Sequence, residues 1–430
     1  MVLASLRGLD DPREADSPPA RWLASWVHCR VFRVDGEGRV RPELARDPGT
    51  MRGRTLTVRL VEGARFHDGQ VITASDVVRS LRALAASSPS TPLARMVASL
   101  ELRAPAPLTL ELEAPAHTDP SAIRRLLARP EAGVLRGGAV GSGHACGSFR
   151  PVDRGAGRAT LLAWPGHPRG RPWLDRVEVT ARPDPRARSA AFGDQEVDVS
   201  ETAGLRDRRG ASSPAGGLVS AYAIPAPDLR GDGALAFRRF AAALAMDARL
   251  VRHADWPAQG ADSLWPPLLS PTRAPIATSG PATGPAPPQP ALVIAYPEGD
   301  EGLGELARGL RDALARLSLA PARAVPVAGL DMASAVAATA PAWQLAVVTH
   351  AWGALDTEQA ALELAMALGR DDLTAARALA GRGRARAERL NAEAAAIPLL
   401  HMERPIHHRS WLVLDAGPSG ADLGEAWVRP

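Results

Sequence analysis

Residues 55–84 read TLTVRLVEGARFHDGQVITASDVVRSLRAL and have the pattern of a strand, a turn and a helix. In the first part of this segment apolar and polar side chains alternate, as they do in a half-buried strand. The Asp-Gly pair at 68–69 predicts a tight turn, because glycine accepts a positive φ and aspartate can hydrogen-bond to its own backbone. Thr73 and Asp76 have the spacing of a capping box, and apolar residues follow at helical intervals as far as Leu84. This periodicity fits any α/β protein.

The residues of Phe66–Leu81 are more specific than their periodicity. They follow the pattern F-H-D-G-x-x-[IV]-T-A-x-D-V-V-x-S-L, which resembles the most recognisable segment of the bacterial extracytoplasmic solute-binding proteins of family 5. Members of that family are the peptide- and nickel-binding components of ATP-driven (ABC) importers. Shorter matches follow the order of the family along most of the chain, at residues 9–12, 34–45, 147–150, 174–177, 192–198, 239–247 and 397–401.

Composition limits the class of protein. The chain has 430 residues, 46% of them hydrophobic, which predicts a globular protein of two or three domains. No run approaches the roughly eighteen apolar residues of a membrane-spanning helix. The formal net charge is only +4 and every basic residue is arginine, so the composition gives no basis for inferring nucleic-acid binding. Because lysine is absent, a Walker A loop and a Schiff-base lysine are both excluded, and a partner would hydrolyse the ATP that drives import.

Catalytic and metal signals are weak. The Gly-Ser-Gly run at 141–143 lacks the G-x-S-x-G elbow of a nucleophile, and no base accompanies it. His401, His407 and His408 are possible metal ligands, but the family has ordinary first-lobe structure in that region. We therefore expect no enzyme activity, no cofactor and no metal.

Two cysteines, Cys29 and Cys146, each have a histidine nearby, His28 and His144. Three interpretations are open: a soft-metal site, a disulfide in an exported protein, and two separate thiols. Of these the sequence favours separate thiols.

The first residues differ from those of an exported protein. Residues 1–19 have no basic start, apolar stretch or small-residue cleavage site of a secretory signal. Leu9–Pro12 resembles a family segment that follows the first strand of the mature protein. We expect that the natural start lies upstream or that an export signal was removed, and a cytosolic location is the alternative.

The resemblance implies the architecture. It predicts an α/β protein with the two-lobed, periplasmic-binding-protein-like fold (type II, peptide-binding cluster) and a hinge of two chain crossings. Lobe I would contain residues 1–228 and 397–430, and lobe II residues 229–396. Lobe II is shorter than in the family, and its Pro-rich tract at 270–290 predicts a surface loop without helix or strand.

A βαβ unit is predicted within lobe II. Residues 291–296 form a short apolar run, leucines recur at helical spacing from Leu303 to Leu317, and residues 323–327 have the pattern of a returning parallel strand. Residues 332–338 and 345–349 repeat this pattern.

Four residues are the candidate ligand-binding set: Asp356, Trp352, His350 and Tyr296. In the dipeptide-binding branch of the family, an aspartate shortly after a strand and a tryptophan binds the ammonium group of the peptide, and Asp356 occupies a similar place. A charge-assisted hydrogen bond of this kind is physically sensible. The alternative for Asp356 is the N-cap of a helix that begins near Thr357. Tyr296 stands where that branch has an arginine for the peptide carboxylate, so dipeptide specificity does not follow.

The resemblance also implies function. We expect a monomeric extracytoplasmic solute-binding protein that binds a peptide or similar small polar ligand in a cleft between lobes and delivers it to an ABC permease in the membrane. Its location would be the periplasm or cell envelope, and it would have no nucleic-acid partner. The alternative is a degenerate or regulatory relative without a transport role.

Overall fold

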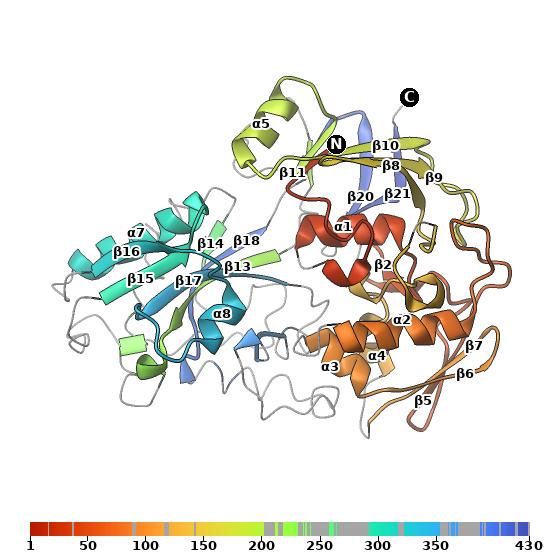
Figure 1. The fold of residues 1–430 in the computed structure, drawn as a ribbon, viewed down its shortest axis with the longest axis horizontal. Coiled ribbons are helices and arrows are strands. Elements are labelled where there is room, and N and C mark those ends of the chain that lie inside the picture. Colours follow the sequence, from red (N-terminus) through yellow and green to blue (C-terminus); the bar gives the residue numbers. More distant parts are fainter. Residues whose placement is uncertain are drawn as a thin grey trace. The chain divides into compact units, whose positions relative to one another are not determined.

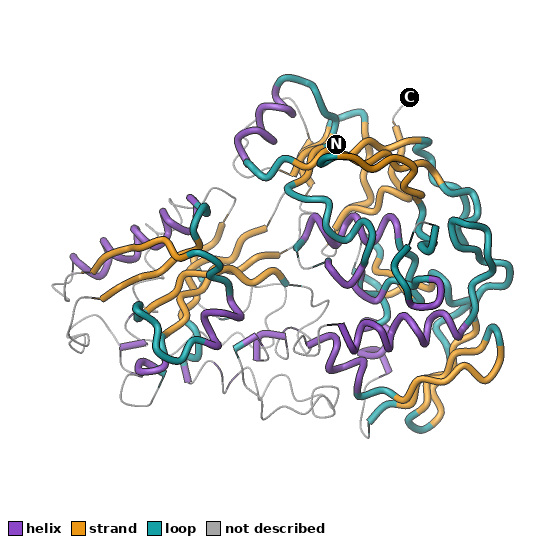
Figure 2. The backbone as a smooth tube through the Cα atoms, viewed as in Figure 1, coloured by secondary structure: helices purple, strands orange, loops and turns teal. Residues whose placement is uncertain are grey.

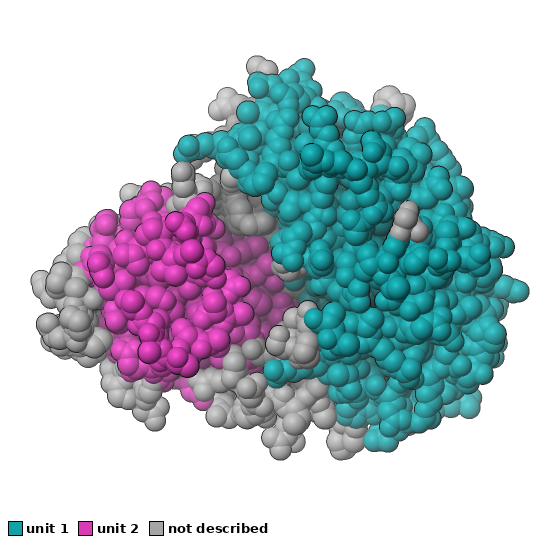
Figure 3. Space-filling model, in the orientation of Figure 1, with its two compact units in different colours: residues 1–217, 374–381, 404–430 teal, residues 218–373, 382–403 magenta. Residues whose placement is uncertain are grey.

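The structure is a computed structural model that divides into two compact units (Figures 1 and 3). Within the described residues, unit 1 contains 1–217 and 404–430, and unit 2 contains 218–373 and 382–403. The described residues are 1–15, 17–36, 38–87, 92–115, 120–141, 143–201, 211–213, 218–230, 235, 237–238, 241, 258–261, 264, 292–316, 322–352, 360, 363–365, 367–368, 388, 390, 393–403, 406–417 and 420–428.

The segment of residues 55–84 folds as its pattern predicts. Strand β5 (Thr55–Arg59) buries Leu56 and Val58, and helix α2 (Ala74–Ser87) buries the predicted apolar face. Between them, the amide of Gly69 donates to the carbonyl of Phe66 at 2.8 Å, and Gly69 has a φ of +88°. The predicted turn is confirmed.

Strand β5 belongs to a four-stranded antiparallel sheet with the strand order β4-β5-β7-β6. Leu110 and Leu112 of β7 lie opposite Val58 and Leu56 of β5, so the apolar residues share one face. The elements of this part are β4 (Thr50–Arg52), β6 (Glu101–Ala106), β7 (Thr109–Glu113), α3 (Pro92–Ala98), α4 (Pro120–Leu126) and the 3₁₀ turns η2 (Pro130–Ala132) and η3 (Arg136–Gly138).

A seven-stranded mixed sheet forms the second part of unit 1, in the order β12-β19-β11-β1-β10-β9-β8. Helix α1 (Pro18–Val27) contributes Trp22 and Trp26 to the core below this sheet, both almost fully buried. The elements are β1 (Val2–Leu3), η1 (Pro12–Glu14), β2 (Phe32–Val34), β3 (Val40–Pro42), β8 (Phe149–Gly155), β9 (Arg158–Ala163), β10 (Arg176–Ala181), α5 (Pro185–Gly193), β11 (Val199–Glu201), β12 (Ala211–Ser213), β19 (Ile406–His408), β20 (Leu412–Gly417) and β21 (Gly420–Val428).

The cysteines differ from the expectation of separate thiols. Cys29 and Cys146 form a disulfide across 117 positions, with Cα atoms 5.1 Å apart. The two residues are distant in sequence, and the folding of the 133–147 loop against the end of α1 brings them together; the amide of Gly147, for example, donates to the carbonyl of Val27 at 2.7 Å. The prediction of two separate thiols was therefore wrong, and the disulfide interpretation is the correct one.

Unit 2 is built on a six-stranded sheet in the order β14-β18-β13-β17-β15-β16. The predicted βαβ unit is confirmed, because β15 pairs in parallel with both β16 and β17. Figure 1 shows α7 on one side of this sheet and α8 on the other, as successive right-handed crossovers require. The elements are β13 (Leu218–Pro225), η4 (Pro227–Leu229), β14 (Ala258–Gly260), β15 (Leu292–Pro297), α7 (Glu301–Arg316), β16 (Ala322–Val327), α8 (Met332–Ala337), β17 (Leu345–Ala351) and β18 (Ile397–Glu403).

The unit boundaries differ from the predicted lobes at both crossings. Residues 218–228 and 397–403 were assigned to lobe I, but both segments belong to unit 2. The reason is their pairing: β13 lies between β17 and β18 and hydrogen-bonds to both, so all three strands share one sheet (Figure 2). The chain from residue 404 onward returns to unit 1.

Some predictions concern parts of the chain outside the described residues. The Pro-rich tract at 270–290 and Asp356 are among them. Within the described residues, no helix has both the length and the apolar composition that crossing a membrane requires.

Candidate ligand-binding site

The candidate site in unit 2 is a row of polar side chains across the middle of its sheet. Ser220 of β13 lies opposite His350 of β17 on one side and opposite His401 of β18 on the other. Paired residues of neighbouring strands point to the same face, so these three side chains are neighbours. A polar row in the interior of an apolar sheet is costly unless its members are hydrogen-bonded to one another.

Ser220 is the centre of this row. Its Oγ atom accepts a hydrogen bond from the indole Nε1 of Trp352 at 2.7 Å, and it lies 2.7 Å from Nδ1 of His401. Because an indole N–H can only donate, the hydroxyl proton of Ser220 is available for His401, whose Nδ1 then accepts. All three residues are buried. The contacts therefore fix the ring of Trp352 in one orientation.

His350 and Glu363 extend the group. His350 Nε2 lies 3.3 Å from the Oε1 atom of Glu363, a buried carboxylate. The imidazole of His350 also meets the indole of Trp352 edge to face, with ring centroids 4.7 Å apart and planes at 89°. Aromatic pairs favour this geometry. Two of the predicted site residues, His350 and Trp352, are thus brought into direct contact.

Tyr222 is a further buried polar residue on the same strand as Ser220. It follows Ser220 by two positions on β13, and its hydroxyl donates to the carbonyl of Leu264. Burial raises the pKa of the Tyr222 phenol above its ordinary value, so the hydroxyl stays protonated and acts as a donor.

Tyr296, by contrast, lies elsewhere. It is half-buried on β15, and the guanidinium of Arg308 from α7 stands 6.0 Å from its ring centroid, in cation–π range. Among the contacts of the described residues, none joins Tyr296 to the group around Ser220. Asp356 lies outside the described residues, and Trp352 is the last described residue before it. The roles of both residues in binding remain predictions.

Sequence reasoning did not identify Ser220, Glu363 or Tyr222 as site residues, and it considered His401 only as a possible metal ligand. A signal for Ser220 was present, because it is the one small polar residue in the otherwise apolar and aromatic run LVSAYAIP of β13. A polar residue at the centre of a fully buried strand requires a partner, and the partner marks a site. Among the described residues, no group of three or more potential ligands is arranged to bind a metal ion.

A family model matches part of this chain. Residues 39–213 match the family described as bacterial extracellular solute-binding proteins, family 5 Middle. The match includes the Phe66–Leu81 segment, so the resemblance found in the sequence is confirmed. A search of curated protein sequences found no match.

Solved structures resemble the chain over nearly its whole length. The murein tripeptide binding protein MppA of Escherichia coli has a TM-score of 0.76 at 13% identity, covering 99% of this chain and 97% of that one. NikA of Brucella suis, in complex with Fe(III)-EDTA, has a TM-score of 0.75 at 16% identity, with 100% and 99% covered. OppA of Haemophilus influenzae, in complex with RPPGFSPFR, has a TM-score of 0.74 at 12% identity, with 100% and 98% covered. These similarities confirm the predicted two-lobed α/β fold.

Proposed function

Because residues 39–213 match family 5 of the bacterial extracellular solute-binding proteins, we propose that this chain binds a peptide or similar small polar ligand outside the cytoplasm. It then delivers this ligand to the membrane permease of an ABC importer. The proposal includes a monomeric protein that performs no catalysis and binds no nucleic acid. Proteins with the same fold include a murein tripeptide binding protein, one in complex with the peptide RPPGFSPFR and one in complex with Fe(III)-EDTA.

The observation that carries the proposal for unit 2 is the fixed position of Trp352. Its indole Nε1 donates to Ser220 at 2.7 Å, and its backbone amide donates to the carbonyl of Leu218 at 3.0 Å. The chain is therefore held in place immediately before residues 353–359, which contain Asp356. A ligand-binding residue that follows a rigid strand end closely in the sequence loses less conformational entropy when the ligand binds.

In this proposal Asp356 binds the ammonium group of the ligand and Trp352 supports it. A carboxylate that pairs with an ammonium away from water forms a charge-assisted hydrogen bond, worth more than a neutral one. Removing such a partner costs about 2 to 4 kcal/mol, because the remaining charge is left unpaired.

The test is calorimetric titration of the full chain with a pool of short peptides. We expect saturable binding by the wild type and a loss of affinity of about thirtyfold or more in Asp356→Ala, which corresponds to about 2 kcal/mol. The matched control is Asp331→Ala. Asp331 is the N-cap of α8 in the same unit and accepts from the Ser334 amide at 2.7 Å, so its loss should reduce stability by about 1 kcal/mol and leave affinity unchanged.

Two results would contradict the proposal in different ways. If Asp356→Ala behaves as Asp331→Ala does, losing stability but no affinity, Asp356 is a helix cap. If the wild type binds none of the peptides, the proposed role in peptide transport is wrong. The chain is then a relative that keeps the fold without this role.

A further inference from the structure

The disulfide of unit 1 closes off a stretch of chain that has a sheet of its own. Residues 30–145 lie between Cys29 and Cys146, and we call them the enclosed segment. The strands of the four-stranded sheet, β4 to β7, lie within it, together with α2, α3 and α4. Helix α1 and the strands of the seven-stranded sheet lie outside it, in the remainder of unit 1. The disulfide therefore joins the two points at which the chain leaves the remainder and returns to it.

The enclosed segment and the remainder have separate apolar cores. The cluster of buried residues below the seven-stranded sheet includes Trp26 and Leu161. Of the described residues in this cluster, only Ala145 comes from the enclosed segment, where it is the last residue. The enclosed segment buries other apolar side chains, such as Leu56 of β5 and Leu81 of α2, and α2 packs against β6 and β7. Two cores predict two cooperative units within unit 1.

Ion pairs cross the junction between the two parts. Arg21 of α1 donates from Nε to the carboxylate of Glu131 at 3.0 Å. Arg33 of β2 lies with its Nη2 atom 2.9 Å from Oε1 of Glu425 on β21. When the contacts between two packed units are polar rather than a large apolar surface, motion of one unit relative to the other is the expected behaviour.

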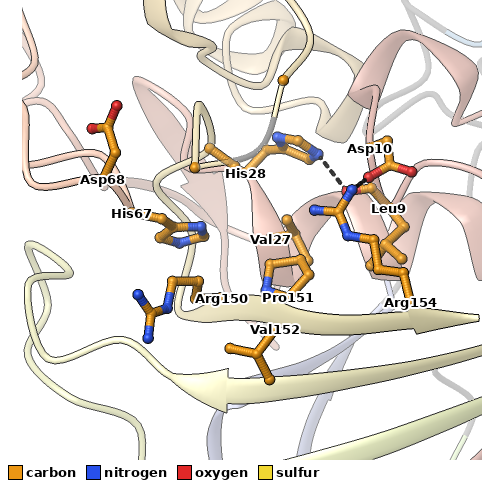
Figure 4. Close-up of a pocket in the computed structure, with 13 residues that line it drawn as sticks. Leu9, Asp10, Val27, His28, His67, Asp68, Arg150, Pro151, Val152 and Arg154 are labelled. Carbon is orange, nitrogen blue, oxygen red and sulfur yellow. Dashed lines mark hydrogen bonds and ion pairs between the residues drawn. The ribbon is translucent and has the colours of Figure 1, made fainter.

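A cavity of about 370 Å³ lies along the same junction (Figure 4). Val27 and Val152 line it from the remainder, and His67 and Gly143 line it from the enclosed segment. His67 also connects the two parts, because its Nε2 atom lies 3.0 Å from the carbonyl of Gly147. Protein cores are close-packed, so this cavity marks a place where the two parts do not pack fully against each other.

The position of the disulfide determines which unfolding step it affects. If the enclosed segment unfolds alone, the folded remainder still holds its ends together, since the amide of Gly147 donates to the carbonyl of Val27 at 2.7 Å. The disulfide then adds no restriction to the unfolded segment. If the remainder unfolds as well, the disulfide closes a loop with a sequence separation of 117 in the unfolded chain and lowers its entropy.

We propose that the Cys29–Cys146 disulfide makes the enclosed segment a module that opens and closes while the seven-stranded sheet stays folded. The bond stabilises the remainder selectively, because only unfolding of the remainder releases the loop that the bond closes. Without the bond the two parts unfold together. This conformational device lies in unit 1 and is independent of the ligand proposed for the group around Ser220 in unit 2.

Native-state hydrogen exchange of the oxidised full chain in low concentrations of urea tests the proposal. Amides of β5 and α2 should exchange through an opening that exposes only the enclosed segment. Their exchange rates should therefore rise less steeply with urea than those of β9 and β10, which require unfolding of the remainder. A single urea dependence shared by all of these amides would overturn the proposal.

Leu161→Ala tests the independence of the two parts with the disulfide intact. Leu161 of β9 is fully buried in the core of the remainder. Its loss should accelerate exchange in β9 and β10 at least about tenfold. Exchange in β5 and α2 should change by less than about threefold, because the module opens without the remainder. Equal acceleration in all four elements would overturn the proposal.

The double variant Cys29→Ala/Cys146→Ala tests the role of the bond itself. Exchange in β9 and β10 should accelerate at least about thirtyfold, and the acceleration in β5 and α2 should be at least about tenfold smaller. Equal acceleration of both sets, or a larger effect in β5 and α2, would contradict selective stabilisation of the remainder. If this variant does not fold, the oxidised wild type and Leu161→Ala still decide between one cooperative unit and two.

Discussion

The hydroxyl of Ser220 and the indole of Trp352 lie 2.7 Å apart, Nε1 to Oγ, although 132 positions separate them in the sequence. The same hydroxyl meets His401, which belongs to a third strand. One small side chain therefore ties together β13, β18 and the residue that follows β17. Networks of this kind specify a single arrangement when every member is satisfied, and they are costly when one member is missing.

Replacing Ser220 tests this network. Ser220→Ala leaves the buried N–H of Trp352 and Nδ1 of His401 without this partner, so we expect a loss of about 1 to 3 kcal/mol in the free energy of unfolding of unit 2. The measurement is urea denaturation followed by hydrogen exchange of the β13 and β17 amides. Thr349→Ala, at an exposed position of β17, is the control and should change stability by less than about 0.5 kcal/mol. Equal stability of Ser220→Ala and wild type would mean that the network contributes nothing.

The disulfide should stabilise unit 1 and leave unit 2 unaffected. Cys29 and Cys146 close a loop with a sequence separation of 117, and disulfides over long loops contribute about 2 to 5 kcal/mol. We expect the double variant Cys29→Ala/Cys146→Ala to lose this amount in unit 1, measured by denaturant unfolding with hydrogen exchange assigned to each unit. A reducing agent should destabilise the wild type to a similar extent and leave the double variant unchanged. A reductant effect on the double variant would show that something other than this bond responds.

A buried ion pair in unit 1 gives another test. Glu43 accepts from the amide of Arg30 at 3.1 Å and from its Nε at 2.9 Å, and both residues are buried. Burial alone would raise the pKa of Glu43, but the charge of Arg30, the hydrogen bond from His167 and the charge of Arg169 together outweigh it, so the pKa is lowered and the carboxylate stays ionised. Glu43→Gln leaves the Arg30 charge unpaired, and we expect a loss of about 3 to 5 kcal/mol in unfolding experiments.

The control for this pair is an exposed one. Glu101 lies 2.7 Å from Arg103, and both side chains are more than half exposed. Glu101→Gln should therefore change stability by less than about 1 kcal/mol. Similar losses in Glu43→Gln and Glu101→Gln would show that burial does not distinguish the two pairs.

Local pattern was enough to predict much of the fold. The alternation in β5 and the helical spacing of α2 depend on neighbouring residues, and so does the βαβ unit of β15, α7 and β16. The predicted lobe boundaries, after residues 228 and 396, were misplaced for the opposite reason. Whether β13 belongs to one unit or the other depends on which strands it pairs with, and pairing is not encoded in the local alternation.

The candidate site was only partly predictable for the same reason. His350 and Trp352 are close in sequence and were found through a resemblance, whereas Ser220 and His401 come from distant strands whose register brings them together. The disulfide also joins distant residues, and sparse cysteine usage favoured the wrong interpretation. The burial of His28 and His67 depends on loops that are distant from them in the sequence. The residues next to His28 and His67 in the sequence therefore do not predict it.

Two buried histidines, His28 and His67, should make the stability of unit 1 sensitive to acid. The pKa of His28 is lowered to about 3 and that of His67 to about 4, against an ordinary value of 6.5, so the folded state binds fewer protons than the unfolded state in this interval. Stability is therefore fully present above about pH 6.5 and is lost as the pH falls toward 4, by about 3 to 6 kcal/mol in total. Denaturation of unit 1 measured across this range checks the slope. In His67→Gln an amide can still donate to the Gly147 carbonyl but does not titrate, so the slope should fall to about half. A flat wild-type profile, or an unchanged slope in His67→Gln, would mean that these rings are not the groups that take up protons on unfolding.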